Sequence, residues 1–311
     1  AGLLSGAAVF SSVVESALTA AILPAEAFVQ KFVPVKRKSV RGEVVLVTGA
    51  AHGVGRCLAL EFGRLGATVV LWDINRDGNE ATAEQIREEG GTTRAYQCDC
   101  SKREEIQRVA QQVKEEVGDV TILFNNAGVM TTGSVLDLTD DQIERTFQVN
   151  VLAHFWTIRA FLPSMMTRNQ GHIAALASIA GYSGSPYMVD YSSSKHAVVG
   201  LMDTLQKELG LQGKDGIRTT TVCPFFVDTG FCPNPKIGSS TGGLRVLSPE
   251  EVALEAVDAV LKNIRRVIMP SEMRSVPLMT QLLPYKTQSL MQNSADISFD
   301  LMQSGPHNKT D

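Results

Sequence analysis

The sequence has little that would suit an exported, metal-binding or nucleic-acid-binding protein. It has five cysteines in 311 residues, an odd number, and Cys98 and Cys100 are too close together for a usual zinc pair. We therefore expect no metal site, and reduced thiols in a chain that faces the cytosol. The net charge of -4 gives no electrostatic basis for binding nucleic acid.

Charge is also nearly missing from the N-terminus. Glu15 is the one charged residue between Leu3 and Leu23, and a basic run follows at residues 36–38. About 20 apolar residues can cross a bilayer. Glu15 and Pro24 indicate a less regular segment, so a membrane-inserted hairpin or an interfacial helix pair is as good an interpretation as a single membrane span. The basic flank would keep the following domain in the cytosol. A secretory signal peptide is the alternative, although no basic region precedes the apolar run.

A tyrosine and a lysine lie one helical turn apart in Tyr191-Ser-Ser-Ser-Lys195. A phenol with a pKa of about 10 must lose roughly 3 units to act as a base near neutrality, which costs about 4 kcal/mol. One ammonium at about 4 Å supplies roughly that amount at an effective dielectric of about 20. Any amphipathic helix can carry this spacing, so its meaning depends on the rest of the chain.

A glycine-rich turn follows a short β-branched run, Val44–Val47. Residues 48–55 read T-G-x-x-x-G-x-G, and a helix is expected to start near Val54. Glycines let the backbone approach a pyrophosphate, whose charge is met by the free N–H groups of the helix. A second strand is expected at residues 68–72, and it ends in Asp73.

Asp73 is placed to accept the two ribose hydroxyls of an adenosine and to repel the extra phosphate of NADP. The sequence therefore favours NAD. Arg76, three residues further on, is the counterargument, because it could reach a 2′-phosphate if its loop folds back.

Two further apolar runs end in polar residues. The strand expected at residues 120–124 leads into Asn125-Asn126-Ala127-Gly128, in which an Asn can bond the adjoining strand. The strand expected at residues 173–177 ends at Ser178, thirteen positions before Tyr191. Ligands of open α/β sheets bind at the carboxyl ends of the strands, so we expect these residues to share one face with the glycine turn.

In this order and spacing, the motifs resemble the short-chain dehydrogenase/reductase superfamily from Gly42 to about Pro270. Segments such as Leu71-Trp72-Asp73-Ile74-Asn75 and Ala153-His154-Phe155-Trp156-Thr157 are similar to a membrane-associated subgroup. That subgroup contains lipid-droplet 17-beta-hydroxysteroid dehydrogenases and retinol dehydrogenases of the endoplasmic reticulum. The resemblance implies a lipophilic alcohol as substrate.

The resemblance also implies four catalytic residues. Tyr191 would take the hydroxyl proton as hydride moves to the nicotinamide, and Ser178 would hold the substrate oxygen. Lys195 would lower the pKa of Tyr191 and bond the nicotinamide ribose. Asn150, in a helix expected over residues 140–167, would hold a water that connects Lys195 to solvent.

Further positions are implied as cofactor contacts. The full set is Gly49, His52, Gly53, Val54, Gly55, Asp73, Asp99, Asn126, Ala127, Gly128, Tyr191, Lys195, Pro224, Val227 and Thr229. Asp99 would bond the adenine edge, with capping of a helix near Lys102 as the alternative. Phe225 stands where the wider superfamily commonly has glycine, and its bulk suggests that it shapes the pocket.

The expected fold is α/β, a Rossmann-type doubly wound parallel sheet in one catalytic domain. We divide the chain into an anchor at 1–39, the dehydrogenase domain at 40–270, a lid or membrane-associating segment at 271–303 and a polar tail at 304–311. The apolar stretch at 276–285 suits a substrate-entry lid or a dimer or core contact equally well. The residues at 231–247 suggest a mobile loop over the site. The helices at 140–167 and 192–211 match those that pair subunits in most relatives, so we expect a homodimer.

The expected function is NAD-dependent interconversion of a lipophilic alcohol, a steroid 17-beta-hydroxyl or retinol, and its carbonyl. We expect the protein on the endoplasmic reticulum membrane or lipid droplets, with the catalytic domain in the cytosol. An NADP-dependent carbonyl reductase would share every catalytic residue. A lipid-droplet scaffold with little turnover is the alternative that is not an enzyme.

Overall fold

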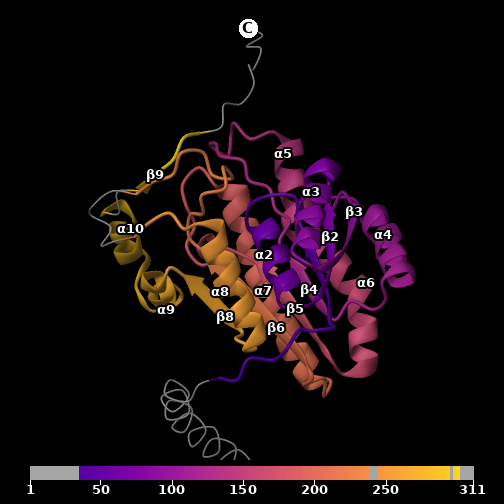
Figure 1. Cartoon of the computed structure of the whole chain (residues 1–311). Helices are drawn as coiled ribbons and strands as arrows, with labels where there is room; N and C mark the ends of the chain where they lie inside the picture. Colours follow the sequence, from indigo (N-terminus) through magenta and orange to yellow (C-terminus); the bar gives the residue numbers. More distant parts are fainter. Residues whose placement is uncertain (1–34, 238–243, 295–296, 302–311) are drawn as a thin grey trace, which may run out of the picture. The chain divides into compact units, whose positions relative to one another are not determined.

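The computed structural model describes residues 35–237, 244–294 and 297–301 (Figure 1). Contacts divide the chain into two compact units, Ala1–Lys38 and Ser39–Asp311. Most of the expected anchor and all of the expected polar tail lie outside the described residues. In the part of the chain that is described, no helix is both long and apolar enough to cross a membrane.

One parallel sheet of seven strands forms the centre of the second unit. The strand order is β3-β2-β1-β4-β5-β6-β8, and each neighbouring pair is parallel. The strands are β1 Val44–Thr48, β2 Thr68–Asp73, β3 Thr92–Gln97, β4 Ile122–Asn125, β5 Gly171–Leu176, β6 Ile217–Pro224 and β8 Arg266–Met269. This order confirms the doubly wound sheet that the sequence predicts.

Both faces of the sheet are buried, because helices cover each of them. Alternate residues of a strand point to opposite faces. Val45 and Val47 belong to the core on one face, and Leu46 belongs to the core on the other. All three side chains are fully buried. This explains why β1 is a continuous apolar run rather than an alternating one.

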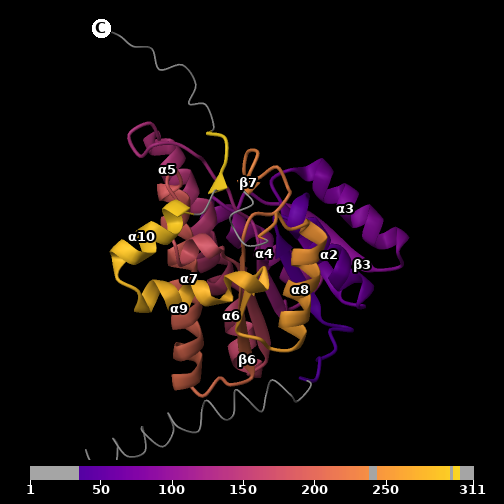
Figure 2. The ribbon, with the colours of Figure 1, turned by 90° about the vertical axis from the view of Figure 1, so that its left-hand side faces the viewer.

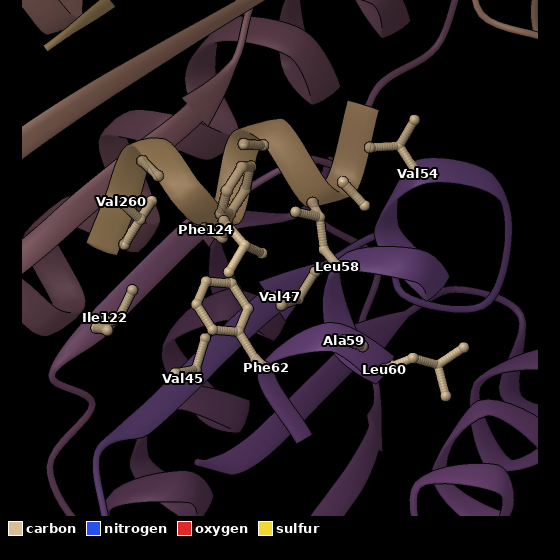
Figure 3. Close-up of a cluster of buried hydrophobic side chains, with 14 of the residues drawn as sticks. Val45, Val47, Val54, Leu58, Ala59, Leu60, Phe62, Ile122, Phe124 and Val260 are labelled. Carbon is tan, nitrogen blue, oxygen red and sulfur yellow. The ribbon is translucent and has the colours of Figure 1, made fainter. Parts of the chain in front are cut away.

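The helices form two layers. The layer against Val45 and Val47 contains α2 Gly53–Arg64, α3 Arg76–Glu88 and α8 Pro249–Leu261. Figure 3 shows its centre, where Leu58 and Phe62 of α2 and Val260 of α8 meet the sheet residues. The opposite layer contains α4 Arg103–Glu116, α6 Ala153–Arg168 and α7 Val189–Leu211, and α5 Asp140–Phe147 packs against α7.

The helix expected over residues 140–167 is present, but it is not regular throughout. The turn Gln148–Leu152, labelled η1, is π-helical and joins α5 to α6. Asn150 lies in the middle of this turn and is completely buried. Single π-turns within α-helices are often found at functional sites.

The C-terminal part of the second unit lies outside the parallel sheet. It contains η4 Ser271–Ser275, α9 Val276–Leu282, α10 Tyr285–Ser294 and β9 Ile297–Ser298. β9 pairs antiparallel with β7 Lys236–Ile237, which belongs to the long loop after β6. Figure 2 shows the yellow C-terminal segment beside this loop. The expected mobile loop at 231–247 is described only in part, because residues 238–243 lie outside the described ranges.

Candidate active site

The glycine turn lies between β1 and α2, at the carboxyl edge of the sheet, where β2 and β4 flank β1 on opposite sides. Gly49 and Gly53 have φ of +68° and +55°, a conformation that other residues adopt at a cost. A Cβ on Gly55 would lie 1.9 Å from the Gly49 carbonyl oxygen and 2.5 Å from Asn126 Nδ2. The turn therefore requires glycine at these positions, and its backbone is open to a ligand at the N-terminus of α2.

The loop after β4 is bonded directly to this turn. Asn126 Nδ2 donates to the carbonyl oxygens of Thr48 and Gly49, at 2.9 and 3.1 Å. The amides of Asn126 and Ala127 both donate to Thr48 Oγ1 at 3.0 Å. This confirms that an Asn of this loop bonds the adjoining strand end, as the sequence predicts.

Asp73 ends β2 and faces the glycine turn. Its Oδ2 accepts from the amide of Ala51 at 2.9 Å, and its Oδ1 accepts from the amide of Asn75 at 2.8 Å. Each carboxylate oxygen can accept more than one bond, so both remain able to receive a hydroxyl. Arg76 is the first residue of α3 and lines a separate polar cleft together with Asp99.

Asp99 does not cap a helix, so that alternative interpretation is wrong. The N-cap of α4 is Lys102. Asp99 instead accepts bonds from the amide and hydroxyl of Ser101, at 3.0 and 2.7 Å, which stabilises the turn before α4. Its proposed bond to an adenine edge stays a prediction.

Tyr191 and Lys195 lie in the first two turns of α7, on the face that points to the sheet edge. Lys195 Nζ donates to the Leu176 carbonyl at 2.8 Å and lies 5.6 Å from the centroid of the Tyr191 ring. Burial lowers the pKa of Lys195 to about 8. Burial raises the pKa of Tyr191 to about 12, although a hydrogen bond with Ser178 acts in the opposite direction.

The lowered tyrosine pKa expected from the Tyr-Lys spacing is therefore not found in this structure. The physical reason is that both groups leave water together, and desolvation disfavours the charged form of each. The spacing was nevertheless informative, because it brings the ammonium onto the ring face.

Ser178 follows β5 and is the N-cap of the short 3-10 helix Ile179–Gly181, labelled η2. Its Oγ accepts from the amide of Ala180 at 3.1 Å and donates to the Pro224 carbonyl at 3.4 Å. These contacts fix the hydroxyl at the end of the sheet, within reach of Tyr191. A hydroxyl fixed in this way is preorganised to bind a substrate oxygen.

Asn150 lies behind these groups and joins three segments. Its Oδ1 accepts from the Val129 amide at 2.8 Å, and its Nδ2 donates to the Val129 carbonyl at 2.9 Å and to Ser194 Oγ at 3.0 Å. Ser194 Oγ in turn donates to the Tyr191 carbonyl at 2.6 Å. The side chain thus connects the loop after β4 to the helix that carries Tyr191 and Lys195, and a role in holding water stays a prediction.

These residues meet in one cleft of ≈ 460 Å³. Of the positions expected from the sequence, its walls include Gly49, His52, Gly53, Val54, Gly55, Asp73, Asn126, Ala127, Gly128, Ser178, Tyr191, Lys195, Pro224, Val227 and Thr229. Thr229 Cγ2 would lie 3.0 Å from a Cβ on Gly53, so the loop after β6 approaches the glycine turn closely. Asp99 and Asn150 do not line this cleft.

The other end of the cleft is apolar, and sequence reasoning missed most of it. Phe225 was expected to shape the pocket, and it lies there together with Phe226 and Phe231. Met130 and Met188 complete this wall, although they belong to no motif and carry no signal in the sequence. The cleft therefore combines a backbone cradle suited to a dinucleotide with a group of apolar side chains, and Ser178 and Tyr191 line the same cleft.

Comparisons with known proteins agree with this geometry. Residues 43–235 match the short chain dehydrogenase family. The chain is 45% identical to estradiol 17-beta-dehydrogenase 11 of Mus musculus, over 88% of this chain and 91% of that protein. It is 46% identical to 17-beta-hydroxysteroid dehydrogenase 13 of Homo sapiens, over 88% of this chain and 90% of that protein.

Solved structures are similar as well. A short chain dehydrogenase/reductase from Burkholderia phymatum in complex with NAD matches with a TM-score of 0.70 at 28% identity, covering 83% of this chain and 98% of that one. A metagenomic short-chain oxidoreductase in complex with NADP matches with a TM-score of 0.63 at 29% identity, covering 74% and 97%. The glycine cradle fits such a dinucleotide. The chain belongs to the short chain dehydrogenase family and is an oxidoreductase that uses NAD(P).

Proposed function

We propose that this protein interconverts a lipophilic alcohol, a steroid 17-beta-hydroxyl or retinol, and the corresponding carbonyl compound, with NAD as cofactor. The observation that carries the proposal is the single cleft whose walls include the glycine cradle, Ser178, Tyr191 and a group of apolar side chains. The names of the similar 17-beta-hydroxysteroid dehydrogenases support a steroid. The aromatic and methionine side chains of the wall suit any flat, apolar alcohol.

Tyr191 is the acid/base residue. Its phenol oxygen takes the proton of the substrate hydroxyl during oxidation and returns it to the carbonyl oxygen during reduction. The Ala180 amide holds Ser178 Oγ, and the one hydroxyl proton turns from its long 3.4 Å contact with the Pro224 carbonyl to the same substrate oxygen, where it stabilises the charge that develops. A dinucleotide bound in the glycine cradle would supply the hydride-transfer chemistry, to or from the carbon that carries this oxygen.

Lys195 assists this proton transfer. Its ammonium lies over the Tyr191 ring, and a pKa near 8 lets it exchange a proton close to neutral pH. When the phenol loses its proton, the adjacent positive charge favours the anion. Asn150 holds the loop after β4 and helix α7 at a fixed separation, which keeps Tyr191 and Lys195 in place.

NAD rather than NADP is supported by the surroundings of Asp73. Its carboxylate lines the cleft beside the glycine turn, where a 2′-phosphate would meet a negative charge. Arg76, the residue that could reverse this preference, lines the neighbouring polar cleft instead.

A location on the endoplasmic reticulum membrane or lipid droplets, with the catalytic domain in the cytosol, is supported by exposed apolar side chains near the C-terminus. Leu278 and Leu282 of α9 and Tyr285 and Leu290 of α10 are all mostly exposed. Contiguous exposed apolar residues of this kind mark membrane or protein contacts. They would let a lipophilic substrate pass from a lipid phase to the cleft.

A homodimer is supported by apolar exposure on the helices expected to pair subunits. Leu152 in η1 and Phe155 in α6 are 41% and 42% exposed, and Val189 at the start of α7 is 46% exposed. A second copy of the chain would cover these side chains with its own equivalents.

The test is NADH formation by the full chain in detergent or on lipid droplets, with estradiol and retinol offered separately. Tyr191→Phe keeps the ring and removes the phenol oxygen, so we expect turnover to fall by about 10²–10⁴ while NADH still binds. Tyr187→Phe is the matched control, because Tyr187 is half exposed and is not among the cleft residues. Binding of NAD without oxidation of either alcohol by the wild type would contradict the proposed substrates.

A further inference from the structure

The last described residues, Ile297–Leu301, form a strap that is bonded to two loops beside the cleft. Through its backbone, β9 pairs with β7, so that Ser298 lies opposite Lys236. The Asp300 amide donates to the Pro233 carbonyl at 3.0 Å, and the Asp300 carboxylate accepts from Asn234 Nδ2 at 2.6 Å. These bonds fix the strap to the loop after β6.

The strap is also joined to the loop that follows β4. Thr132 Oγ1 donates to the Asp300 carbonyl oxygen at 3.3 Å. The loop before β7 contributes Phe231 and Cys232 to the cleft, and the loop after β4 contributes Met130. Asp300 therefore connects two segments that both supply side chains to the apolar wall.

Phe299 is the strap residue whose side chain reaches this wall. It packs against the cluster of Met130, Met188 and Cys232, together with Phe226. The Phe299 and Phe226 ring centroids are 6.3 Å apart, with the rings tilted by 58°. Such a tilted arrangement is a favourable aromatic contact. Phe226, Met130, Met188 and Cys232 line the cleft directly, so Phe299 supports the wall from behind.

The same small cluster includes the proposed catalytic tyrosine. Tyr191 packs against the three buried residues of the cluster, and its ring centroid is 6.0 Å from that of Phe231. A change in the packing of Phe226 or Met188 would thus alter the space beside the Tyr191 ring. Apolar side chains in such a pocket are close-packed, so even one lost ring is felt by its neighbours.

We infer that Phe299 determines which alcohols this site accepts, and that Asp300 positions it. The inference rests on the proposed function and deepens it, because it names the residue that matches the pocket to a bulky, rigid alicyclic alcohol. Phe299 holds Phe226 and Met188 against such a substrate, whereas a small alcohol bound at Ser178 and Tyr191 does not extend to this wall. Phe299 therefore affects selectivity between large and small alcohols, and the proton transfer itself is left intact.

The test compares Phe299→Ala with the wild type in the full chain. We expect kcat/KM for estradiol to fall about tenfold and kcat/KM for cyclohexanol to change less than about twofold, in keeping with the value of hydrophobic contacts in enzyme specificity. The Kd for estradiol, measured by equilibrium dialysis in the presence of NADH so that the alcohol is not oxidised, should rise in parallel. The Kd for NADH should not change.

Leu301→Ala is the matched control, since Leu301 belongs to the same strap and its side chain is 49% exposed. Leu301→Ala should leave kcat/KM unchanged for both alcohols. Asn234→Ala removes the bond to the Asp300 carboxylate and leaves every side chain of the apolar wall present. The ratio of kcat/KM for estradiol to kcat/KM for cyclohexanol should therefore fall, as in Phe299→Ala, but by about threefold. Phe299→Leu retains apolar volume and should fall between Phe299→Ala and the wild type.

The comparison requires a wild type that oxidises estradiol. If Phe299→Ala then changes kcat/KM equally for both alcohols, or for neither, the inference is overturned. A wild type that neither binds nor oxidises estradiol or retinol would contradict the proposed function, and the strap would then have no large substrate to select. The two failures are thus separated by the behaviour of the wild type.

Discussion

The ammonium of Lys195 lies 5.6 Å from the centroid of the Tyr191 ring and is bonded to the Leu176 carbonyl. Both side chains come from the same helix, α7, and both are withdrawn from water. Burial consequently moves the two pKa values apart, lowering that of Lys195 to about 8 and raising that of Tyr191 to about 12. Desolvation therefore favours the neutral form of each side chain, the phenol of Tyr191 and the amine of Lys195.

The lowered pKa of Lys195 gives a stability that depends on pH. The lysine releases its proton near pH 8 in the folded protein and near 10.5 in the unfolded one, so between these values the unfolded state binds more protons. The wild type therefore gains stability as the pH rises through this window. Tyr191 acts in the opposite direction only above about pH 10, because its pKa is raised.

We predict that Lys195→Met is more stable than the wild type at pH 7 and that the difference shrinks by about 2 kcal/mol by pH 9.5. Urea unfolding at a series of pH values measures it. Lys207→Met, on the same helix, is the control and should show no such trend. A constant difference across the range would mean that Lys195 is not buried as a charge.

Much of the site could be predicted because parallel strands deliver their ends to one edge. The glycine turn, Asn126, Ser178 and Tyr191 each follow a local pattern, and the sheet brings them together without further information. These patterns depend on neighbours in sequence, such as an apolar run followed by glycine or a hydroxyl.

The rest depends on contacts between distant segments. The strap joins Asn234 to Asp300, 66 positions apart, through a strand pair of two residues on each side. No periodic pattern marks so short a pair. The raised pKa of Tyr191 likewise follows from burial by other segments, which the Tyr-Lys spacing does not contain. The bonds of Asn150 also reach Val129 in the loop after β4 and Ser194 in α7, both far from it in the sequence.

Asn150 is predicted to be important for stability as well as for activity. Asn150→Ala leaves the Val129 amide and carbonyl without their partner inside the protein, which we expect to cost about 2–4 kcal/mol. Ser194→Ala is the matched control, because it removes one bond of Asn150 and the bond to the Tyr191 carbonyl but leaves both Val129 groups paired, and it should cost about 1–2 kcal/mol. Chemical denaturation measures both values, and equal costs would show that Asn150 does not bridge these segments.

Gly55 is predicted to accept no side chain. An alanine there would place its Cβ 1.9 Å from the Gly49 carbonyl oxygen, so the cradle must open. We expect Gly55→Ala to weaken NADH binding by at least about a hundredfold. Gly210→Ala is the control, since Gly210 lies in α7 with no atom within 4 Å of the added Cβ, and it should stabilise the protein by up to about 1 kcal/mol. Fluorescence titration with NADH would contradict the prediction if Gly55→Ala bound normally.

The exposed face of α9 is predicted to contact lipid. Leu278→Ser combined with Leu282→Ser should reduce co-flotation of the full chain with phosphatidylcholine vesicles severalfold, because both side chains are exposed and apolar. Leu211→Ser is the control, since Leu211 is 91% exposed at the end of α7. Equal flotation of all variants would show that α9 is not a membrane contact.

Asp73 is predicted to set the choice of cofactor. Asp73→Ser removes the negative charge that would face a 2′-phosphate, so the NADP affinity should rise about tenfold or more while the NAD affinity falls. The amides of Ala51 and Asn75 lose their carboxylate partner, and the glycine turn should become less stable by about 1–2 kcal/mol. Arg76→Ala, in the adjacent cleft, is the control and should leave the NAD to NADP ratio unchanged. The measurement is the dissociation constant for each dinucleotide. If the ratio of the NAD and NADP constants responds to Arg76→Ala and not to Asp73→Ser, the loop before α3 folds back and the protein prefers NADP.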